Sequence, residues 1–385
     1  MRIIKLLFRN AFRHKLRTWL TILGMTVAIL AFGMLRTLVS AWYAGVEASS
    51  ANRLVTRNSI SLVFSLPISY KDKIRQVDGV TQVSYGNWFG GIYIDEKHFF
   101  ANFAVEPRTY LELYPELMLP PAQKTAFLRD RRSAIAGRKL AERYGWKIGD
   151  SVTLKGTIFP GDWDFVLRGI YSGRDRSTDE TMFLFHWDYL NETLKKTVPR
   201  RADQVGFFMI GIKNPGLAAE VSVAVDKLFK NSLAETLTET EKAFQLSFIS
   251  MTEAIVVAIQ LVSFVVIIII MAVVANTMAM TTRERLGEYS ILKALGFGGG
   301  YIAALIFGES FVITSIGCAL GIAATFPAAS VFKKMLSMYF PIFNVAPETI
   351  YMDVAASLVV GIAAAIAPTL HAARIRIADG LRRIG

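Results

Sequence analysis

The stretch AIVVAIQLVSFVVIIIIMAVVANTM (residues 254–278) leads directly into AMTTRERLGEYSILKALG (residues 279–296). The first part carries no charge over about 25 residues, which is long enough for a helix to cross a bilayer. The second part places charged and apolar residues at helical spacing and ends at Gly296, a residue type that often stops a helix. Another apolar run follows, so we predict a short surface helix between two membrane spans.

Apolar windows of this kind explain the hydrophobic content of 53%. We predict an α-helical membrane protein with four transmembrane helices and an α+β extracytoplasmic domain inserted between the first and second. The spans are expected at residues 19–43, 250–279, 300–326 and 352–370, with the short helix at 280–297. A basic amphipathic helix at residues 1–18 precedes the first span, and a tail at 371–385 follows the last.

The net charge of +12 is concentrated in the short segments beside the spans. Short basic segments mark the cytoplasmic side of a membrane. Both termini are therefore expected in the cytoplasm, while residues 44–246 and the loop 327–351 lie outside, and nucleic-acid binding is not indicated. A cleaved secretory signal ending at Ala41 is the alternative, but the apolar core of such a signal is normally shorter than this one.

The outer segment mixes strand and helix periodicities. We expect one α+β subdomain from residues 45–115 and 205–246, with a strand-rich insertion at 116–204. Strand patterns occupy residues 80–94, 151–157, 165–171, 182–186 and 205–212, and helical spacing occupies 69–77, 133–144 and 215–229.

The outer segment carries no catalytic motif and no metal-ligand spacing. His98 and His186 are isolated, so we assign both to surface or strand packing. Cys318 is the one cysteine of the chain and falls in the third predicted span, so no disulfide is available to the outer segment. The sequence favours a protein that is not an enzyme and binds no metal.

Glu309 lies inside the third predicted span, where an ionisable residue is a functional hypothesis because it is costly to leave unpaired. The alternatives are that Glu309 is neutral against a neighbouring span or that it bonds a residue such as Asn276. Gly317 and Gly321 have the GxxxG spacing that allows close helix approach, and Gly24 is a further packing candidate in the first span.

Three blocks of sequence resemble the permease subunits of MacB/FtsX/LolC-type ABC transporters, the mechanotransmission or type VII superfamily. They are RNAFRHKLRTWLTILG (9–24), NTMAMTTRERLGEYSILKALGF (276–297) followed by FGESFVITSIGCALG (307–321), and APTLHAARIRIADGLR (367–382). The outer stretch SAIAGRKLAERYGWKIGDSVTL (133–154) is similar to the inserted outer subdomain of that family. Each block is weak alone, and their order along the chain carries the resemblance.

The resemblance implies that residues 280–297 form a coupling helix that sits on a separate ABC ATPase subunit in the bacterial inner membrane. The implied contact residues are Thr281, Glu284, Arg285, Glu288, Ile291, Leu292, Lys293 and Gly296. The chain has no GxxxxGK[ST] motif, so ATP and magnesium are expected on the partner, with no cofactor bound directly.

The resemblance also implies a second permease copy or a paralogue, and sometimes a periplasmic adaptor and an outer-membrane channel. The implied function is ATP-driven motion of the periplasmic domains that exports or extracts a lipoprotein, lipid, peptide or drug. The alternative is a non-transporting regulator that activates a periplasmic hydrolase, as in the cell-division members, which usually have a smaller outer domain.

Overall fold

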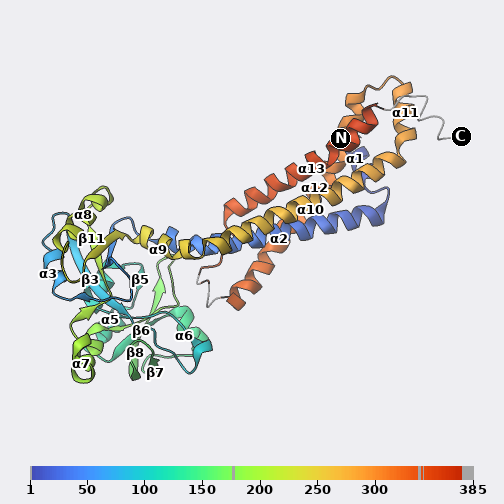
Figure 1. Ribbon diagram of the computed structural model, residues 1–385. Coiled ribbons are helices and arrows are strands. Elements are labelled where there is room, and N and C mark those ends of the chain that lie inside the picture. The colour runs from blue at the N-terminus through green and yellow to red at the C-terminus, as the bar shows by residue number, and fades with distance from the viewer. Residues whose placement is uncertain (1, 176–177, 337–339, 341, 375–385) are drawn as a thin grey trace. The chain divides into compact units, whose positions relative to one another are not determined.

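The computed structural model describes residues 2–175, 178–336, 340 and 342–374 (Figure 1). The chain forms two compact units. The first, here called the helical unit, comprises residues 1–42, 252–337 and 343–385, and the second, here called the α/β unit, comprises residues 43–251 and 338–342.

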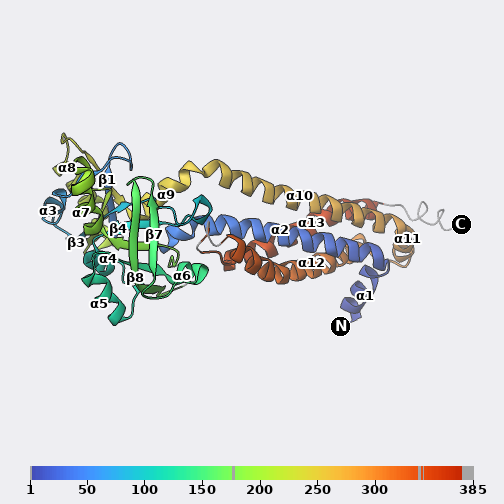
Figure 2. The same ribbon diagram turned by 90° about the horizontal axis from the view of Figure 1, so that it is seen from below.

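Within the described residues, four helices are long and apolar enough to cross a membrane. They are α2 (Lys15–Ala48), α10 (Glu253–Glu284), α12 (Gly299–Leu336) and α13 (Pro347–Arg374). Within the helical unit α13 packs against both α10 and α12, and the helices run alongside one another in Figures 1 and 2. The predicted fold class, with four apolar helices and a mixed domain between the first and second, is confirmed.

Several predicted boundaries differ from the helices of the structure. The basic segment at residues 1–18 is not one helix, because α1 (Arg2–Ala11) ends before a turn at residues 12–14 and α2 begins at Lys15 (Figure 2). The short helix is α11 (Leu286–Ala294), so Thr281 and Glu284 belong to α10 instead. Helix α12 continues through Pro327 to Leu336 and takes up the first part of the predicted outer loop. Residues 375–385 of the predicted tail lie outside the described residues.

Helix α12 meets α2 through two glycines. A Cβ added at Gly317 would lie 2.6 Å from the Cβ of Met25, and one added at Gly321 would lie 2.7 Å from the Cβ of Ile29. Real side chains do not approach so closely, so this contact depends on the absence of a side chain at both positions. By contrast, a Cβ at Gly24 would make an ordinary 3.4 Å contact with Ile270.

Replacing Gly321 by valine should lower the free energy of unfolding of the helical unit by about 1–3 kcal/mol, as overpacking of a tight contact does. Gly24→Ala is the matched control and should change this free energy by no more than about 0.5 kcal/mol. Thermal unfolding of the purified chain in mild detergent measures both. An equal effect of the two variants would show that α2 and α12 are not in close contact at Gly321.

The α/β unit is built on a ten-stranded sheet with the order β12-β1-β11-β3-β4-β9-β6-β8-β5, in which β7 also pairs with β8. The strands are β1 (Arg53–Asn58), β3 (Val80–Trp88), β4 (Asn102–Val105), β5 (Leu117–Met118), β6 (Ser133–Gly137), β7 (Ser151–Gly156), β8 (Gly161–Gly173), β9 (Phe183–His186), β11 (Phe207–Ile212) and β12 (Thr236–Thr240), and β2 (Leu66–Pro67) pairs separately with β10 (Gln204–Val205).

Short helices connect these strands. They are α3 (Tyr70–Ile74), α4 (Pro107–Leu113), α5 (Pro121–Arg129), α6 (Arg138–Tyr144), α7 (Trp187–Thr197), α8 (Ala218–Leu228) and α9 (Glu241–Met251), with 3-10 turns η1 (Glu96–His98), η2 (Pro199–Arg201) and η3 (Pro215–Leu217). The parallel pair β4–β9 joins the strands of residues 45–115 and 205–246 to those of 116–204, so one sheet runs through both predicted parts.

The helix predicted over residues 133–144 is wrong in its first part. Residues Ser133–Gly137 form β6, and all five are buried in the sheet between β8 and β9. Only Arg138–Tyr144 is helical, and it stops at Gly145, which has a φ of 67°. Small residues such as those of SAIAG fit a strand that is covered on both faces, and periodicity alone does not distinguish such a strand from a buried helix.

The α/β unit should lose stability as the pH falls, because one histidine is buried in it. His186 lies at the end of β9, and its Nε2 donates a hydrogen bond to the carbonyl oxygen of Phe127 at 2.7 Å. Burial lowers the pKa of His186 below its ordinary value, and the bond to Phe127 offsets this only in part. The unfolded chain therefore binds a proton at a higher pH than the folded one, so the stabilisation is complete above about pH 6.5 and declines below it.

The decline attributable to His186 should be at most about 1.4 kcal/mol per pH unit. Urea unfolding of the α/β unit in the full chain, repeated at several pH values between neutral and mildly acidic, measures it. His186→Gln should flatten the pH dependence. An unchanged slope in that variant would assign the acid sensitivity to other groups.

Candidate functional site

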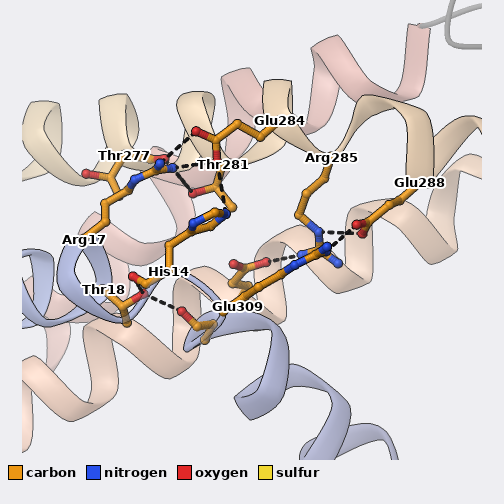
Figure 3. A network of polar contacts seen from close by, with 11 residues as sticks. His14, Arg17, Thr18, Thr277, Thr281, Glu284, Arg285, Glu288 and Glu309 are labelled. Carbon is orange, nitrogen blue, oxygen red and sulfur yellow. Dashed lines mark hydrogen bonds and ion pairs between the residues drawn. The ribbon is translucent and has the colours of Figure 1, made fainter. Parts of the chain in front are cut away.

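One end of the helical unit gathers five segments around a network of charges. The α1–α2 turn, the end of α10, α11, the first part of α12 and the end of α13 contribute side chains or carbonyl groups to it (Figure 3). These segments are joined by apolar packing as well, because Ala11, Ile302 and Ala372 belong to one buried cluster. The network therefore fixes the position of α11 relative to the ends of the spans.

Arg17 connects the start of α2 to the end of α10. Its Nη2 lies 2.7 Å from Oε1 of Glu284 and its Nη1 lies 3.0 Å from Oε2, which is the two-pronged geometry that suits a guanidinium and a carboxylate. His14 lies 3.3 Å from the same carboxylate, and Arg17 also reaches Thr281 at 3.5 Å (Figure 3). Glu284 and Thr281, predicted at the ATPase contact, thus serve contacts inside the chain.

Arg285 stands between α10 and α11 and is only 6% exposed. Its Nη1 donates to Oε2 of Glu309 at 2.9 Å, and its Nε donates to Oε2 of Glu288 at 3.1 Å (Figure 3). The guanidinium carbon lies 5.4 Å from the ring centroid of Tyr289, within the range of a cation–π contact. Arg285, predicted at the ATPase contact, is therefore buried and neutralises Glu309.

Glu288 on α11 receives a second cation, because Arg13 of the α1–α2 turn forms an ion pair with it. Burial alone would raise the pKa of Glu288, but the hydrogen bonds from Arg13 and Arg285 outweigh it, and the pKa lies below its ordinary value. A carboxyl group whose pKa is lower in the folded state stabilises that state at pH values above its ordinary pKa. This stabilisation is lost as the pH falls through the lowered pKa. The network is thus intact at neutral pH.

The remaining predicted residues of α11 and of the turn after it differ in their contacts. Lys293 donates to the carbonyl oxygens of Ala372 and Ala373 near the end of α13, at 3.2 and 2.8 Å. Leu292 is half-buried, and Gly296 has a φ of 92°, which ends the helix.

Apolar side chains are exposed on α11, in the turn after it and at the start of α12. We call this surface the α11 apolar face, and it consists of Ile291, Leu295, Phe297 and Tyr301. Leu295 is 70% exposed, and the rings of Phe297 and Tyr301 lie 4.7 Å apart. Apolar side chains that are exposed together beside charged residues are a common mark of a protein contact.

The partner of Glu309 is not the residue that the sequence suggested. Glu309 is 3% exposed and bonds Arg285, whereas Asn276 is exposed on α10. Sequence reasoning also missed Arg13, His14 and Arg17 as parts of the site, since we took this basic segment as a signal for membrane orientation. One signal was available, because residues 13 and 17 have the same four-residue spacing as the acidic residues 284 and 288 that they meet.

Known proteins are similar to this chain in sequence. Residues 260–377 match the family of FtsX-like permease C-terminal domains. An uncharacterised ABC transporter permease of Methanocaldococcus jannaschii is 24% identical over 355 residues, which cover 86% of this chain and 85% of the relative. The uncharacterised ABC transporter permease YvrN of Bacillus subtilis is 34% identical over 110 residues, or 28% of this chain and 26% of that protein.

Solved structures resemble about half of the chain. The extracellular domain of the transporter YknZ from Gram-positive bacteria is 12% identical, with a TM-score of 0.36, and the match covers 49% of this chain and 99% of that domain. The periplasmic region of MacB from Actinobacillus actinomycetemcomitans is 10% identical, with a TM-score of 0.37, over 53% of this chain and 95% of that region. Residues 260–377 are thus an FtsX-like permease domain, and the chain is homologous to ABC transporter permeases.

Proposed function

We propose that this permease seats a separate ATPase subunit on the α11 apolar face and converts ATP hydrolysis by that subunit into motion of its α/β unit, which exports or extracts a substrate. An ABC transporter permease implies a partner ATPase. The observation that carries the proposal is that the charged residues of α11 bind other segments of the chain while its apolar residues are exposed. Glu288 is held by Arg13 of the α1–α2 turn and Arg285 by Glu309 of α12, whereas Ile291 and Leu295 are exposed and apolar.

The ion pairs and hydrogen bonds of α11 would transmit a force from the proposed contact to the spans. Glu288 and Lys293 tie α11 to the α1–α2 turn and to the end of α13, and Arg285 ties it to α12. A push on α11 would therefore be shared by several spans at once instead of bending one helix end. ATP and Mg²⁺ belong on the ATPase in this proposal, and Ile291 and Leu295 replace the charged residues as its main contacts.

We expect this end of the helical unit in the cytoplasm, because short basic segments mark the cytoplasmic side of a membrane. The α/β unit would then face outward from the inner membrane. A second copy or a paralogue would complete the transporter, and an adaptor and an outer-membrane channel would carry the substrate further. The size of the α/β unit, residues 43–251, favours transport over the regulation of a hydrolase.

Affinity purification of the tagged chain from its native membrane in mild detergent, followed by mass spectrometry, tests the proposal. The unaltered chain should retain an ATPase subunit, and Leu295→Asp should lower its yield at least tenfold by placing a charge in an apolar contact. Val223→Asp is the matched control, because Val223 is 69% exposed but lies on α8 of the α/β unit.

The other possible results of this experiment have different meanings. Loss of the ATPase in both variants would point to misfolding, which size-exclusion chromatography of the variants detects. Full retention in Leu295→Asp would move the contact away from the α11 apolar face. Recovery of a peptidoglycan hydrolase instead of an adaptor or substrate would favour the regulatory function, and recovery of no ATPase by the intact chain would contradict both.

A further inference from the structure

The helical unit contains a second buried acid, remote from the network of the site. Asp353 lies about two turns into α13 and is 1% exposed. Its Oδ1 is buried and has no hydrogen-bond partner among the described residues. A buried carboxyl oxygen without a partner is rare in proteins, and each instance needs a physical reason.

The surroundings of Asp353 are built by three helices. The Oδ2 of Asp353 and the Oγ1 of Thr325 on α12 both lie against Gly33 of α2, at 3.0 and 3.2 Å from where a Cβ would be. The Oγ1 of Thr325 donates to the carbonyl oxygen of Gly321, and the Sγ of Cys318 lies 3.8 Å from the backbone oxygen of Asp353. The carboxyl group is therefore enclosed where α2, α12 and α13 meet.

Charged groups that could neutralise an ionised Asp353 are few. On α2 the nearest in sequence to Gly33 is Arg36, whose Nε is itself buried without a hydrogen-bond partner, and no ion pair joins Arg36 to Asp353 in the described part of the chain. Helix α12 has no charged residue between Glu309 and Lys333, and α13 has no other between Glu348 and His371. Helix α10 has none between its exposed Glu253 and Arg283.

Glu309 is a buried acid of the same unit that has a cationic partner. Its carboxylate is as deeply buried, yet it faces the guanidinium of Arg285 at 2.9 Å. Taking a carboxylate out of water without such a partner costs so much that the group takes up a proton instead. The contrast between the two acids is the basis of the inference.

We propose that Asp353 is a proton-binding site of the helical unit, occupied by a proton in the arrangement described here. The ligand is a proton taken up from water, and the carboxyl group binds it by forming its O–H bond. Because the site is closed by Gly33 and Thr325, release of the proton requires α2 to move away from α12 and α13. Proton release would therefore accompany any step that separates these helices.

Infrared difference spectroscopy of the full chain in lipid at neutral pH tests the proposal directly. The spectrum of the unaltered chain minus that of Asp353→Asn should show the carbonyl stretch of a protonated carboxyl group, which lies above the amide bands. Labelling aspartate with carbon-13 at the side-chain carboxyl should shift this band and leave the amide band of the new asparagine in place.

Glu309→Gln provides the internal control. Because Glu309 is paired with Arg285, its difference spectrum should show the stretches of an ionised carboxylate instead. The same ionised bands for Asp353 would overturn the proposal, whether the group is paired with Arg36 or holds a metal cation.

A second readout covers the case in which the infrared band is obscured. Asparagine has the shape of a neutral aspartic acid, so Asp353→Asn should keep the unfolding midpoint of the helical unit within the error of the unaltered chain. Gly33→Val, which presses on the carboxyl group, should lower the midpoint. A large loss of stability in Asp353→Asn would show that an ionised carboxylate holds the helices together, which is the opposite of the proposal.

Discussion

Replacing Arg285 by methionine should lower the free energy of unfolding of the helical unit by about 3–5 kcal/mol, because it leaves a buried acid without its partner. Glu309 is 3% exposed, and Arg285 is the cation that neutralises it. Methionine retains most of the volume of the aliphatic part of arginine, so the loss is one of charge pairing more than of packing. Denaturant unfolding in mild detergent measures the change.

The neighbouring residue supplies the control. Arg283 is exposed at the end of α10, so Arg283→Met should change the free energy of unfolding by no more than about 0.5 kcal/mol. Adding Glu309→Leu to Arg285→Met should restore much of the lost stability, since an apolar pair can replace a buried ion pair. A double variant that is no more stable than Arg285→Met alone would show that the pair is not the source of the loss.

Replacing Arg53 by methionine should have a comparable effect on the α/β unit, about 3–5 kcal/mol in its free energy of unfolding. The Nε of Arg53 lies 2.8 Å from Glu241, its Nη2 lies 2.7 Å from Glu116, and its guanidinium carbon lies 4.1 Å from the ring centroid of Tyr114. Glu241 also accepts hydrogen bonds from the backbone N–H of Ser50 and the hydroxyl group of Tyr114. The variant would leave two acids in a buried network without their cation.

This network has a particular place in the chain. Ser50 and Arg53 follow α2, and Glu241 begins α9, which leads into α10. The connections that leave and rejoin the spans are thus tied to each other inside the α/β unit. Arg53→Met should therefore also increase hydrogen exchange at the start of β1 and of α9.

The control for Arg53 lies on the same strand. Arg57 pairs with Glu239 at 3.1 Å, in a position more open to water, so Arg57→Met should cost no more than about 1 kcal/mol. Urea unfolding of the full chain, followed in the α/β unit by hydrogen exchange and mass spectrometry, compares the two variants. Similar losses would mean that burial of the Arg53 network adds nothing to its strength.

Much of the membrane fold could be predicted because a single rule decides it. A run such as residues 254–278, without a charge, is costly to leave in water and long enough to span lipid. The helix ends were less predictable, since α12 continues through Pro327 and α1 stops before Lys15, and both depend on packing with distant segments. In the α/β unit the strands β1 and β4 were missed, because they are short and each begins with a polar residue, Arg53 or Asn102, that is buried in the fold.

The sequence indicates where charged residues gather between two spans, but not which contacts each of these residues makes. The sequence indicates charged residues on a short helix between spans, which drew attention to Glu284, Arg285 and Glu288. It does not indicate that Arg13 and Arg17, more than two hundred residues earlier, occupy these acids, because only the folded helices bring the segments together. We therefore propose the α11 apolar face, instead of these acids, as the surface for a partner.

Photo-crosslinking from position 295 in native membranes tests the central claim most directly. A photoreactive amino acid in place of Leu295 should form a covalent product with an ATPase subunit, identified by mass spectrometry, while the same amino acid at Val223 should not. Products at position 295 that contain only lipid or a second copy of this chain would contradict the account, because the α11 apolar face would then be covered by something other than the ATPase.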